Sequence, residues 1–375
     1  MRRALAALAL VIACSGFAGA GPAARAADPT AASPTPLLAY YYIWFTPSSW
    51  SRGKVDFPLL GRYSSDDMSV MRQHVRWAKA AGINGFLVSW KSTPALDDRL
   101  SRLIDVADSE RFHLGIVYEG LDFHRRPLPI QTVKHDLERF ATTFAADKAF
   151  AIFDRPLVIW SGTWRYTNAQ IRLATRNVRG RLLLLASAKN VDDYVRVAPL
   201  VDGNAYYWSS VSPRRYPAYG AKLRALGAAT HDHGGLWIAP AAPGFDARRI
   251  GGSSVVGREG GDTLRRELNA AASSSPDAIG LISWNEFSEN TYVEPSRAYG
   301  STDLKVIADV RGTQPPDVST FDSEGTGTGT APLGISYGIV GLVVGCAGLV
   351  ALTSAVRRRR RPPVGPLTKE PSPRL

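Results

Sequence analysis

The fold of this chain is decided by the stretch 279–296, in which an apolar run leads into a polar, aromatic segment. It reads Ile279-Gly280-Leu281-Ile282-Ser283-Trp284-Asn285-Glu286-Phe287-Ser288-Glu289-Asn290-Thr291-Tyr292-Val293-Glu294-Pro295-Ser296. The run 279–282 has the length and composition of a buried strand. Three carboxylates follow it, on Glu286, Glu289 and Glu294. Charged groups so close to a buried strand must be solvated, paired or used in chemistry.

Glu286 and Glu289 are the candidate catalytic residues of this stretch. In a parallel α/β barrel, active sites are built in the space beyond the C-terminal ends of the strands. A turn or a short helical start would let two carboxylates three residues apart face one pocket, and such a pair suits general acid–base work on a glycosidic bond. The alternative interpretation is a loop whose carboxylates pair with nearby arginines, because structural ion pairs also occur at such positions.

Outward from this stretch, the chain alternates between short apolar runs and amphipathic segments of helix length, which is the pattern of βα units and a parallel sheet. The expected strands are 37–42, 85–89, 113–118, 156–160, 182–187, 204–208, 236–241 and 279–284. The expected helices are 65–81, with Ser65 as a candidate cap, 96–109, 133–146, 167–177, 191–197, 217–229, 263–272 and 302–310. Eight such units predict a (β/α)8 barrel over residues 37–311. An open doubly wound sheet is the alternative, although no GxGxxG follows the first strand.

Aromatic and carboxylate side chains gather where the expected strands end, and in a barrel all of these ends point into one cleft. The residues are Tyr41, Tyr42, Trp90, Glu119, Trp160, Tyr206, Tyr207, Trp208, Trp284, Asn285, Glu286 and Glu289. Aromatic faces stack on sugar rings, while carboxylates and amides bind hydroxyl groups, so the set predicts a carbohydrate cleft. Core or rim packing is an equally good interpretation of any single aromatic residue.

The two ends of the chain predict export and membrane anchoring. Residues 1–26 have the arginines, apolar core and small-residue cleavage site of a signal peptide, although a lipoprotein box ending at Cys14 is an alternative, and 27–36 form a Pro/Ala/Thr/Ser leader. Residues 333–356 carry no charge and are long enough to cross a bilayer. The five arginines that begin the 357–375 tail belong in the cytoplasm by the positive-inside rule. We therefore expect a single-pass plasma-membrane protein, with its barrel outside the cell and a Gly/Thr/Ser/Pro linker at 312–332.

The composition argues against several other classes of protein. Most of the net charge of +12 lies in residues 1–26 and 333–375, so the central part has no basic stripe for a nucleic acid. The two cysteines, Cys14 and Cys346, fall in the predicted signal peptide and membrane span, which leaves no thiolate for a metal or a nucleophile in the barrel. His231 and His233 precede an expected strand and are interpreted as part of a surface loop. We expect no metal and no cofactor.

The barrel sequence resembles glycoside hydrolase family 99, the endo-α-1,2-mannosidases and their bacterial relatives, over residues 37–310. The resemblance lies in the tyrosine-rich first strand up to Trp44, the stretch 80–86 with Ser89-Trp90, Tyr118-Glu119, the stretch 243–246, and Trp284-Asn285-Glu286-Phe287-Ser288-Glu289 with Glu294-Pro295. The last of these segments is the most specific.

The resemblance implies a retaining mechanism without a carboxylate nucleophile. Glu286 matches the residue that deprotonates the sugar's own 2-hydroxyl, which then attacks C1 to give a 1,2-anhydro intermediate, and Glu289 matches the acid/base. These roles require Glu289 protonated and Glu286 ionised, and two neighbouring carboxylates can split their pKa values in this way. Glu119 and Asn285 match sugar-binding positions. The full set of predicted substrate-binding residues is Tyr41, Tyr42, Trp90, Glu119, Tyr207, Trp284, Asn285 and Glu294.

The sequence departs from the family between and after the two glutamates. The mannosidases usually have Trp-His between them and Gly-Thr afterwards, where this chain has Phe287-Ser288 and Asn290-Thr291. Both carboxylates are retained, so the expected activity is endo-acting hydrolysis of an α-mannan-like or other cell-envelope polysaccharide. A non-catalytic glycan-binding receptor on the same barrel is the alternative, but a receptor has no need of paired acids. A membrane-tethered scaffold would leave the aromatic residues unexplained.

Overall fold

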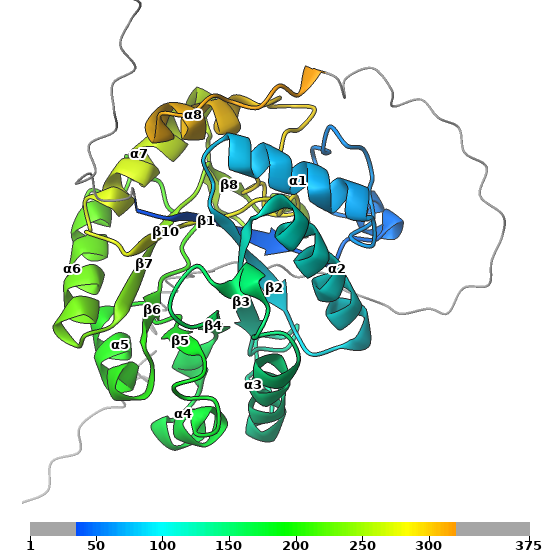
Figure 1. Cartoon of the computed structure of the whole chain (residues 1–375). Coiled ribbons are helices and arrows are strands. Elements are labelled where there is room, and N and C mark those ends of the chain that lie inside the picture. Colours follow the sequence, from blue (N-terminus) through cyan, green and yellow to red (C-terminus); the bar gives the residue numbers. More distant parts are fainter. Residues whose placement is uncertain (1–34, 320–375) are drawn as a thin grey trace, which may run out of the picture. The chain divides into compact units, whose positions relative to one another are not determined.

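The computed structural model describes residues 35–319, and this part of the chain forms a closed parallel barrel (Figure 1). The strands neighbour one another in the order β1-β10-β7-β6-β5-β4-β3-β2. They are β1 (Leu37–Tyr42), β2 (Gly85–Trp90), β3 (His113–Glu119), β4 (Leu157–Ser161), β5 (Leu183–Ala186), β6 (Gly203–Ala205), β7 (Leu236–Ala241) and β10 (Ala278–Leu281). The last strand closes the barrel on the first, with Leu37 opposite Ile279.

Helices surround the ring of strands on its outer side (Figure 1). They are α1 (Met68–Ala80), α2 (Pro94–Glu110), α3 (Ile130–Thr143), α4 (Asn168–Thr175), α5 (Val191–Val197), α6 (Tyr219–Asp232), α7 (Asp262–Ala272) and α8 (Thr302–Arg311). Short 3-10 helices lie at Pro47–Ser51, Lys148–Phe150, Thr163–Arg165, Ala198–Leu200, Arg248–Ile250 and Glu259–Gly261. The connection from β7 to α7 also contains a small antiparallel hairpin, β8 (Phe245–Asp246) and β9 (Val255–Val256). The predicted (β/α)8 barrel is confirmed.

Helix capping differs from the sequence prediction at α1. Asp67 caps this helix, because its Oδ1 accepts a hydrogen bond from the Ser69 backbone N–H at 2.8 Å. The expected cap, Ser65, instead accepts a hydrogen bond from the Phe45 backbone N–H through its Oγ at 3.1 Å. Both residue types favour a helix N-terminus, and the competing contact with the preceding loop decides between them.

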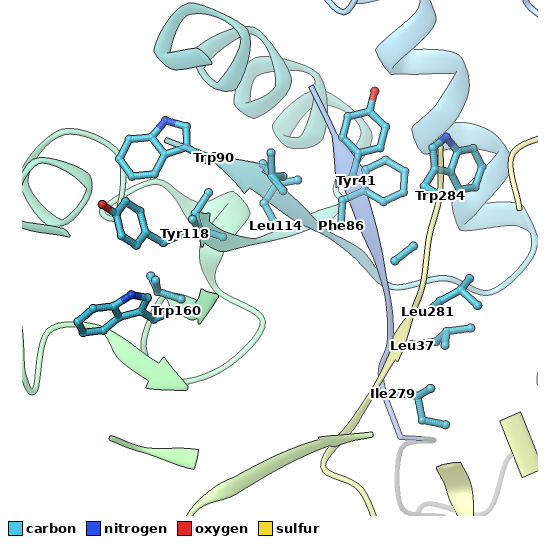
Figure 2. Close-up of a cluster of buried hydrophobic side chains, with 14 of the residues drawn as sticks. Leu37, Tyr41, Phe86, Trp90, Leu114, Tyr118, Trp160, Ile279, Leu281 and Trp284 are labelled. Atoms are coloured by element: carbon cyan, nitrogen blue, oxygen red, sulfur yellow. The ribbon is translucent and has the colours of Figure 1, made fainter. Parts of the chain in front are cut away.

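Side chains alternate between the two faces of each strand and so form two separate apolar clusters. The barrel interior contains Leu38, Tyr40, Leu87, Val117, Leu157, Ile159, Leu183, Leu185, Ala205, Ile238, Ala278 and Ile282. A larger cluster fills the space between the strands and the helices. Figure 2 labels its members Leu37, Tyr41, Phe86, Trp90, Leu114, Tyr118, Trp160, Ile279, Leu281 and Trp284. Adjacent residues of one strand therefore have opposite surroundings.

The predictions for the two ends of the chain fall outside the described residues. This applies to the signal peptide at 1–26, the membrane span at 333–356 and the tail at 357–375, and to most of the leader at 27–36 and the linker at 312–332. Within residues 35–319, no helix combines the length and the apolar character needed to cross a bilayer.

Candidate active site

A pocket with an open volume of about 570 Å³ lies at the C-terminal ends of β1 to β6. Its walls are Tyr40, Tyr42, Ser89, Val117, Glu119, Arg125, Ile159, Ser161, Trp164, Ser187, Lys189, Ala205 and Tyr207. The strands supply the inward-facing members of this set, and the loops after β3, β4 and β5 supply Arg125, Trp164 and Lys189.

The segment after β10 is a compact loop whose two ends are hydrogen-bonded to each other. The Ser283 backbone N–H donates to the Thr291 carbonyl at 2.7 Å, and the Val293 N–H donates to the Ser283 carbonyl at 2.9 Å. Asn285 docks the loop onto the end of β1, because its side-chain amide bonds both the N–H and the carbonyl of Tyr42, at 2.8 and 3.0 Å. The amide thereby takes the place that backbone groups of β10 would have if that strand continued beside β1.

The other side of the loop is held by the β8–β9 region. The Asp246 N–H donates to the Glu289 carbonyl at 2.7 Å, and the Asn290 side-chain amide donates to the Asp246 carbonyl at 3.1 Å. Arg258 donates to the Asn290 carbonyl at 2.9 Å through Nη2. Its guanidinium lies 4.4 Å from the ring centroid of Tyr292. The backbone that carries Glu289 is therefore fixed by contacts on both sides.

Glu286 and Glu289 are both fully buried in this loop. Oε1 of Glu286 accepts a hydrogen bond from the Ser288 backbone N–H at 2.8 Å. In the part of the chain that the structure describes, Oε2 of Glu286 and both carboxylate oxygens of Glu289 have no hydrogen-bond partner. Nearly all buried polar groups in proteins are satisfied, so three such oxygens on neighbouring acids indicate a site that a ligand completes.

The two acids influence each other and titrate above the ordinary range of a glutamate. Burial is the main cause that raises the pKa of Glu289, and the negative charge of Glu286 raises it further, while Arg125 opposes the shift. Burial also raises the pKa of Glu286, but the Ser288 N–H and the positive charge of Lys54 counteract it. We conclude that Glu289 holds its proton more tightly and that Glu286 ionises first.

Lys54 is a residue of the site that the sequence analysis missed. Its Nζ donates to the Ser288 Oγ at 3.1 Å and lies 5.7 Å from the ring centroid of Trp50. Burial lowers the pKa of Lys54, and the charge of Glu286 opposes that shift. Lys54 lies more than two hundred residues before Glu286 in a loop without a recognisable motif, so no sequence signal linked the two.

Three of the predicted substrate-binding residues line the pocket, namely Tyr42, Glu119 and Tyr207. The hydroxyls of Tyr42 and Tyr207 are hydrogen-bonded to each other at 3.0 Å. The Ser89 hydroxyl donates to Oε1 of Glu119 at 2.7 Å. The structure thus brings together side chains from β1, from β3 and from the segment after β6, and sugar binding by them stays a prediction.

Three other predicted binding residues, Tyr41, Trp90 and Trp284, lie on the opposite side of the barrel wall (Figure 2). Tyr41 stacks on Phe86 with ring centroids 4.4 Å apart, and its hydroxyl is hydrogen-bonded to His74. Trp90 is fully buried, and its Nε1 donates to Asp97 at 3.0 Å. None of the three lines the described pocket. Strand alternation directs Tyr41 and Trp90 toward the helices, as it does Trp160. Trp284 lies beyond the end of β10 at Leu281 and packs against His74 and Phe86.

Asn285 and Glu294, which were also predicted to bind substrate, have their polar groups in contact with the protein itself. The side chain of Asn285 is occupied by the backbone of Tyr42. Glu294 is buried, and it accepts from the Tyr63 hydroxyl at 2.9 Å and contacts the His74 Nε2 at 3.0 Å. Of the three carboxylates in the stretch 279–296, Glu294 is therefore the structural one.

The fold and the acid pair together define a class of protein. Active sites of parallel (β/α)8 barrels lie at the C-terminal ends of the strands, and glycoside hydrolases use two carboxyl groups on either side of the scissile bond. The barrel has a pocket at these strand ends, and the loop after β10 carries the buried pair Glu286 and Glu289; neither acid is among the residues that line the pocket.

Comparison with known protein families identifies the class more closely. The sequence profile of glycosyl hydrolase family 99 matches residues 51–311, which is more than half of the chain. The chain therefore belongs to glycosyl hydrolase family 99 and is a glycoside hydrolase, whose substrate is an oligosaccharide or polysaccharide. Comparison with curated protein sequences finds no match.

Solved structures share the same fold. The family 99 endo-α-mannosidase from Bacteroides thetaiotaomicron has a TM-score of 0.65 and 19% identity, over 77% of this chain and 98% of that one. Its complex with bis-tris-propane has a TM-score of 0.64 and 21% identity, over 74% and 96%. A glycoside hydrolase-like protein has a TM-score of 0.60 and 15% identity, over 73% and 93%. At these identities the likeness establishes the fold.

Proposed function

We propose that this protein is a retaining, endo-acting glycosidase that cleaves an α-mannan-like or other cell-envelope polysaccharide. The observation that carries the proposal is the pair of fully buried acids, Glu286 and Glu289, which together present three carboxylate oxygens without a hydrogen-bond partner in the described chain. Membership of family 99 and the similar fold of an endo-α-mannosidase support the substrate class.

In the first half of the proposed reaction, ionised Glu286 takes the proton of the sugar's 2-hydroxyl, and that oxygen attacks C1. Glu289 gives its proton to the departing glycosidic oxygen as the C1–O bond breaks, which leaves a 1,2-anhydro sugar. In the second half, Glu289 takes a proton from a water that attacks C1, and Glu286 returns its proton to the 2-oxygen. Both acids regain their starting states, and the configuration at C1 is retained.

The protonation states that this reaction needs agree with the surroundings of the two acids. The charge of Glu286 and burial together raise the pKa of Glu289, which favours the protonated acid. Lys54 and the Ser288 N–H favour the ionised form of Glu286. Two titratable groups whose pKa values are shifted apart in this way usually serve as the acid and the base of one site.

We also propose that the barrel is exported and held at the outer face of the plasma membrane. The support for this is the sequence pattern of residues 1–26 and of the uncharged stretch 333–356 with its five following arginines. Fractionation of cells that express the full chain, or a chain ending at residue 332, tests the anchor. The full chain is expected in the membrane fraction, and its release by a salt wash alone would contradict the proposal.

The catalytic assignment is tested with Glu289→Gln and Glu286→Gln in the full-length protein. Each change is expected to reduce release of oligosaccharides from α-mannan or from an envelope polysaccharide by about 10²- to 10⁴-fold, because general acid–base steps contribute that much. Glu110→Gln is the control, since Glu110 belongs to an ion pair with Arg76 on the outer helices. Undiminished turnover by Glu289→Gln would contradict the assignment, and glycan binding without any cleavage by the unmodified protein would favour a receptor.

A further inference from the structure

Two positively charged side chains, Arg125 and Lys189, line the pocket. Glu119 is the carboxylate among the lining residues, and it accepts a hydrogen bond from Ser89. None of the ion pairs within residues 35–319 involves Arg125 or Lys189. A pocket whose cations outnumber its acids has a positive potential that low-dielectric walls reinforce.

Further cations lie around this pair. Burial is the first cause that lowers the pKa of Lys189, and the like charges of Arg125, Arg165 and Lys222 lower it further, with Asp193 opposing them. Lys222 lies 4.7 Å from the ring centroid of Trp208 rather than against an acid. The positive charge therefore extends beyond the two pocket residues.

Arg125 lies in the loop between β3 and α3, and the carboxylate of that loop, Asp122, is engaged by residues other than Arg125. Asp122 accepts hydrogen bonds from the backbone N–H groups of His124 and Arg126, at 2.9 and 2.8 Å, and from the Arg126 Nε at 2.8 Å. Arg125 itself has a φ of 60°, in the left-handed region, at the tip of this turn. Asp122 thus neutralises Arg126, and Arg125 is left to face the pocket.

Lys189 is held by an aromatic ring. Its Nζ lies 4.1 Å from the ring centroid of Trp164, which also lines the pocket. A cation–π contact of this kind orients an ammonium group without neutralising its charge. The protein therefore retains two cations at the pocket at an energetic cost, because charges that are partly withdrawn from water lose hydration that no partner replaces.

We infer that the sugar bound in this pocket carries an anionic group, a carboxylate or a phosphate or sulfate ester, which Arg125 and Lys189 bind. The inference rests on the proposed glycosidase function and specifies its substrate as an acidic glycan. An arginine guanidinium matches the two oxygens of such a group with two parallel hydrogen bonds, and a lysine ammonium adds a point charge.

The test is a calorimetric titration of the full-length protein with four monosaccharide probes: D-mannose, D-mannuronate, D-mannose 6-phosphate and D-mannose 6-sulfate. At least one acidic probe is expected to bind about tenfold or more tightly than mannose, and its affinity is expected to fall as salt is added. The probe whose affinity exceeds that of mannose by the largest factor shows whether the anionic group is a uronate, a phosphate ester or a sulfate ester. Equal affinity for all four probes would overturn the inference.

Arg125→Gln and Lys189→Met are each expected to lower the affinity for the preferred acidic probe about tenfold, because each removes one charge-assisted contact. The affinity for mannose should stay unchanged. Arg172→Gln and Lys305→Met are matched controls on the exposed faces of α4 and α8. An equal loss of mannose and acidic-probe binding would show that the change acts on pocket structure, which contradicts the inference. Unchanged acidic-probe binding in both variants would also contradict it.

This inference and the proposed glycosidase can fail separately. If Glu289→Gln abolishes cleavage of neutral mannan while acidic probes show no advantage, the glycosidase stands and the anion site is overturned. If Arg125→Gln weakens acidic-probe binding about tenfold in a protein that cleaves no polysaccharide, the anion site stands and the glycosidase is overturned.

Discussion

The two sides of the barrel wall use the same kinds of residue for opposite purposes. Tyr42 faces the pocket and Tyr41, its neighbour on β1, faces the helices and bonds His74. On the loop after β10, Glu289 has two carboxylate oxygens without a partner in the described chain, while Glu294 contacts both Tyr63 and His74. Residue type alone does not separate a catalytic cleft from a packed core.

The two sets of side chains differ in whether their packing and hydrogen-bond partners come from the protein itself or from a ligand. On the helix side, aromatic rings pack against one another, and polar atoms such as the Tyr41 hydroxyl and the Trp90 Nε1 have partners within the protein, so the free energy of unfolding depends on them. On the loop after β10, the unpartnered oxygens of Glu286 and Glu289 depend on a ligand, and a folded protein tolerates such groups at some cost in stability. Substitutions on the helix side should therefore change stability, and those on the pocket side should change activity.

The largest difference in stability is expected from Trp90→Ala. Trp90 is fully buried against Phe140 and Phe144, so its removal leaves a cavity and should lower the free energy of unfolding by about 3–5 kcal/mol. Urea denaturation followed by far-UV circular dichroism measures the change. Activity per folded molecule should remain close to that of the unmodified protein.

Tyr207→Ala is the pocket-side counterpart of this change. Tyr207 lines the pocket, and its ring lies edge-on to Tyr40 with centroids 5.0 Å apart. We expect a smaller loss of stability than for Trp90→Ala and a larger loss of kcat/KM. The comparison fails if Trp90→Ala lowers activity and leaves the denaturation midpoint unchanged.

A second, smaller difference in the free energy of unfolding is expected between glutamine substitutions of two acids on the same loop. Glu294→Gln should lower the free energy of unfolding by about 1–3 kcal/mol, because buried His74 and Tyr63 lose a charged acceptor. Glu289→Gln should instead raise it at neutral pH, since burial and Glu286 disfavour the ionised form of Glu289. Denaturation curves at pH 7 check both signs.

The pH dependence follows from the raised pKa of Glu289. The folded state holds this proton above the ordinary glutamate value of 4.5, where the unfolded chain has lost it. The contribution of Glu289 to stability is therefore complete below pH 4.5 and disappears as the pH rises through the folded pKa. The stabilisation by Glu289→Gln should accordingly shrink as the pH falls toward 4.5, and a constant advantage at all pH values would refute the assignment.

The smallest expected effect is a shift in the pH profile of Lys54→Met. Lys54 lowers the pKa of Glu286, so its removal should raise that pKa and move the acidic limb of kcat/KM to higher pH. Lys54→Arg retains the charge and should leave the limb in place. An acidic limb that stays fixed in Lys54→Met, or moves equally in both variants, would show that Lys54 does not support the ionised base.

The order of the elements was predictable because strand and helix periods differ and the turns are marked. Every predicted strand and helix overlaps an observed one, from β1 at Leu37–Tyr42 to α8 at Thr302–Arg311. The expected strands at 204–208 and 279–284 were too long, since β6 ends at Ala205 and β10 at Leu281. Beyond these ends, side-chain contacts such as that of Asn285 with Tyr42 replace the strand ladder.

Some predicted binding residues line the pocket and others pack against the helices, a distinction that the ends of the expected strands do not show by themselves. Tyr41 and Trp90 face outward on their strands, whereas Tyr42 and Glu119 face inward. Strand alternation separates these four residues once one inward residue of each strand is known. It does not place Trp284, which follows the end of β10 and belongs to the outer cluster although Ile282, two residues earlier, faces the interior. Lys54, Arg125 and Lys189 lie in loops, where no such period exists.

The sequence by itself determined the alternation of strands and helices and the position of Glu286 and Glu289 just beyond the last strand. These features depend on local periodicity and on the spacing of a short motif, which neighbouring residues fix. Only the tertiary structure decided which side of the wall each side chain faces, which carboxylate is neutralised by partners, and which loop cations reach the pocket. Those outcomes depend on contacts between residues far apart in the chain, such as Lys54 with Ser288 and Glu294 with His74.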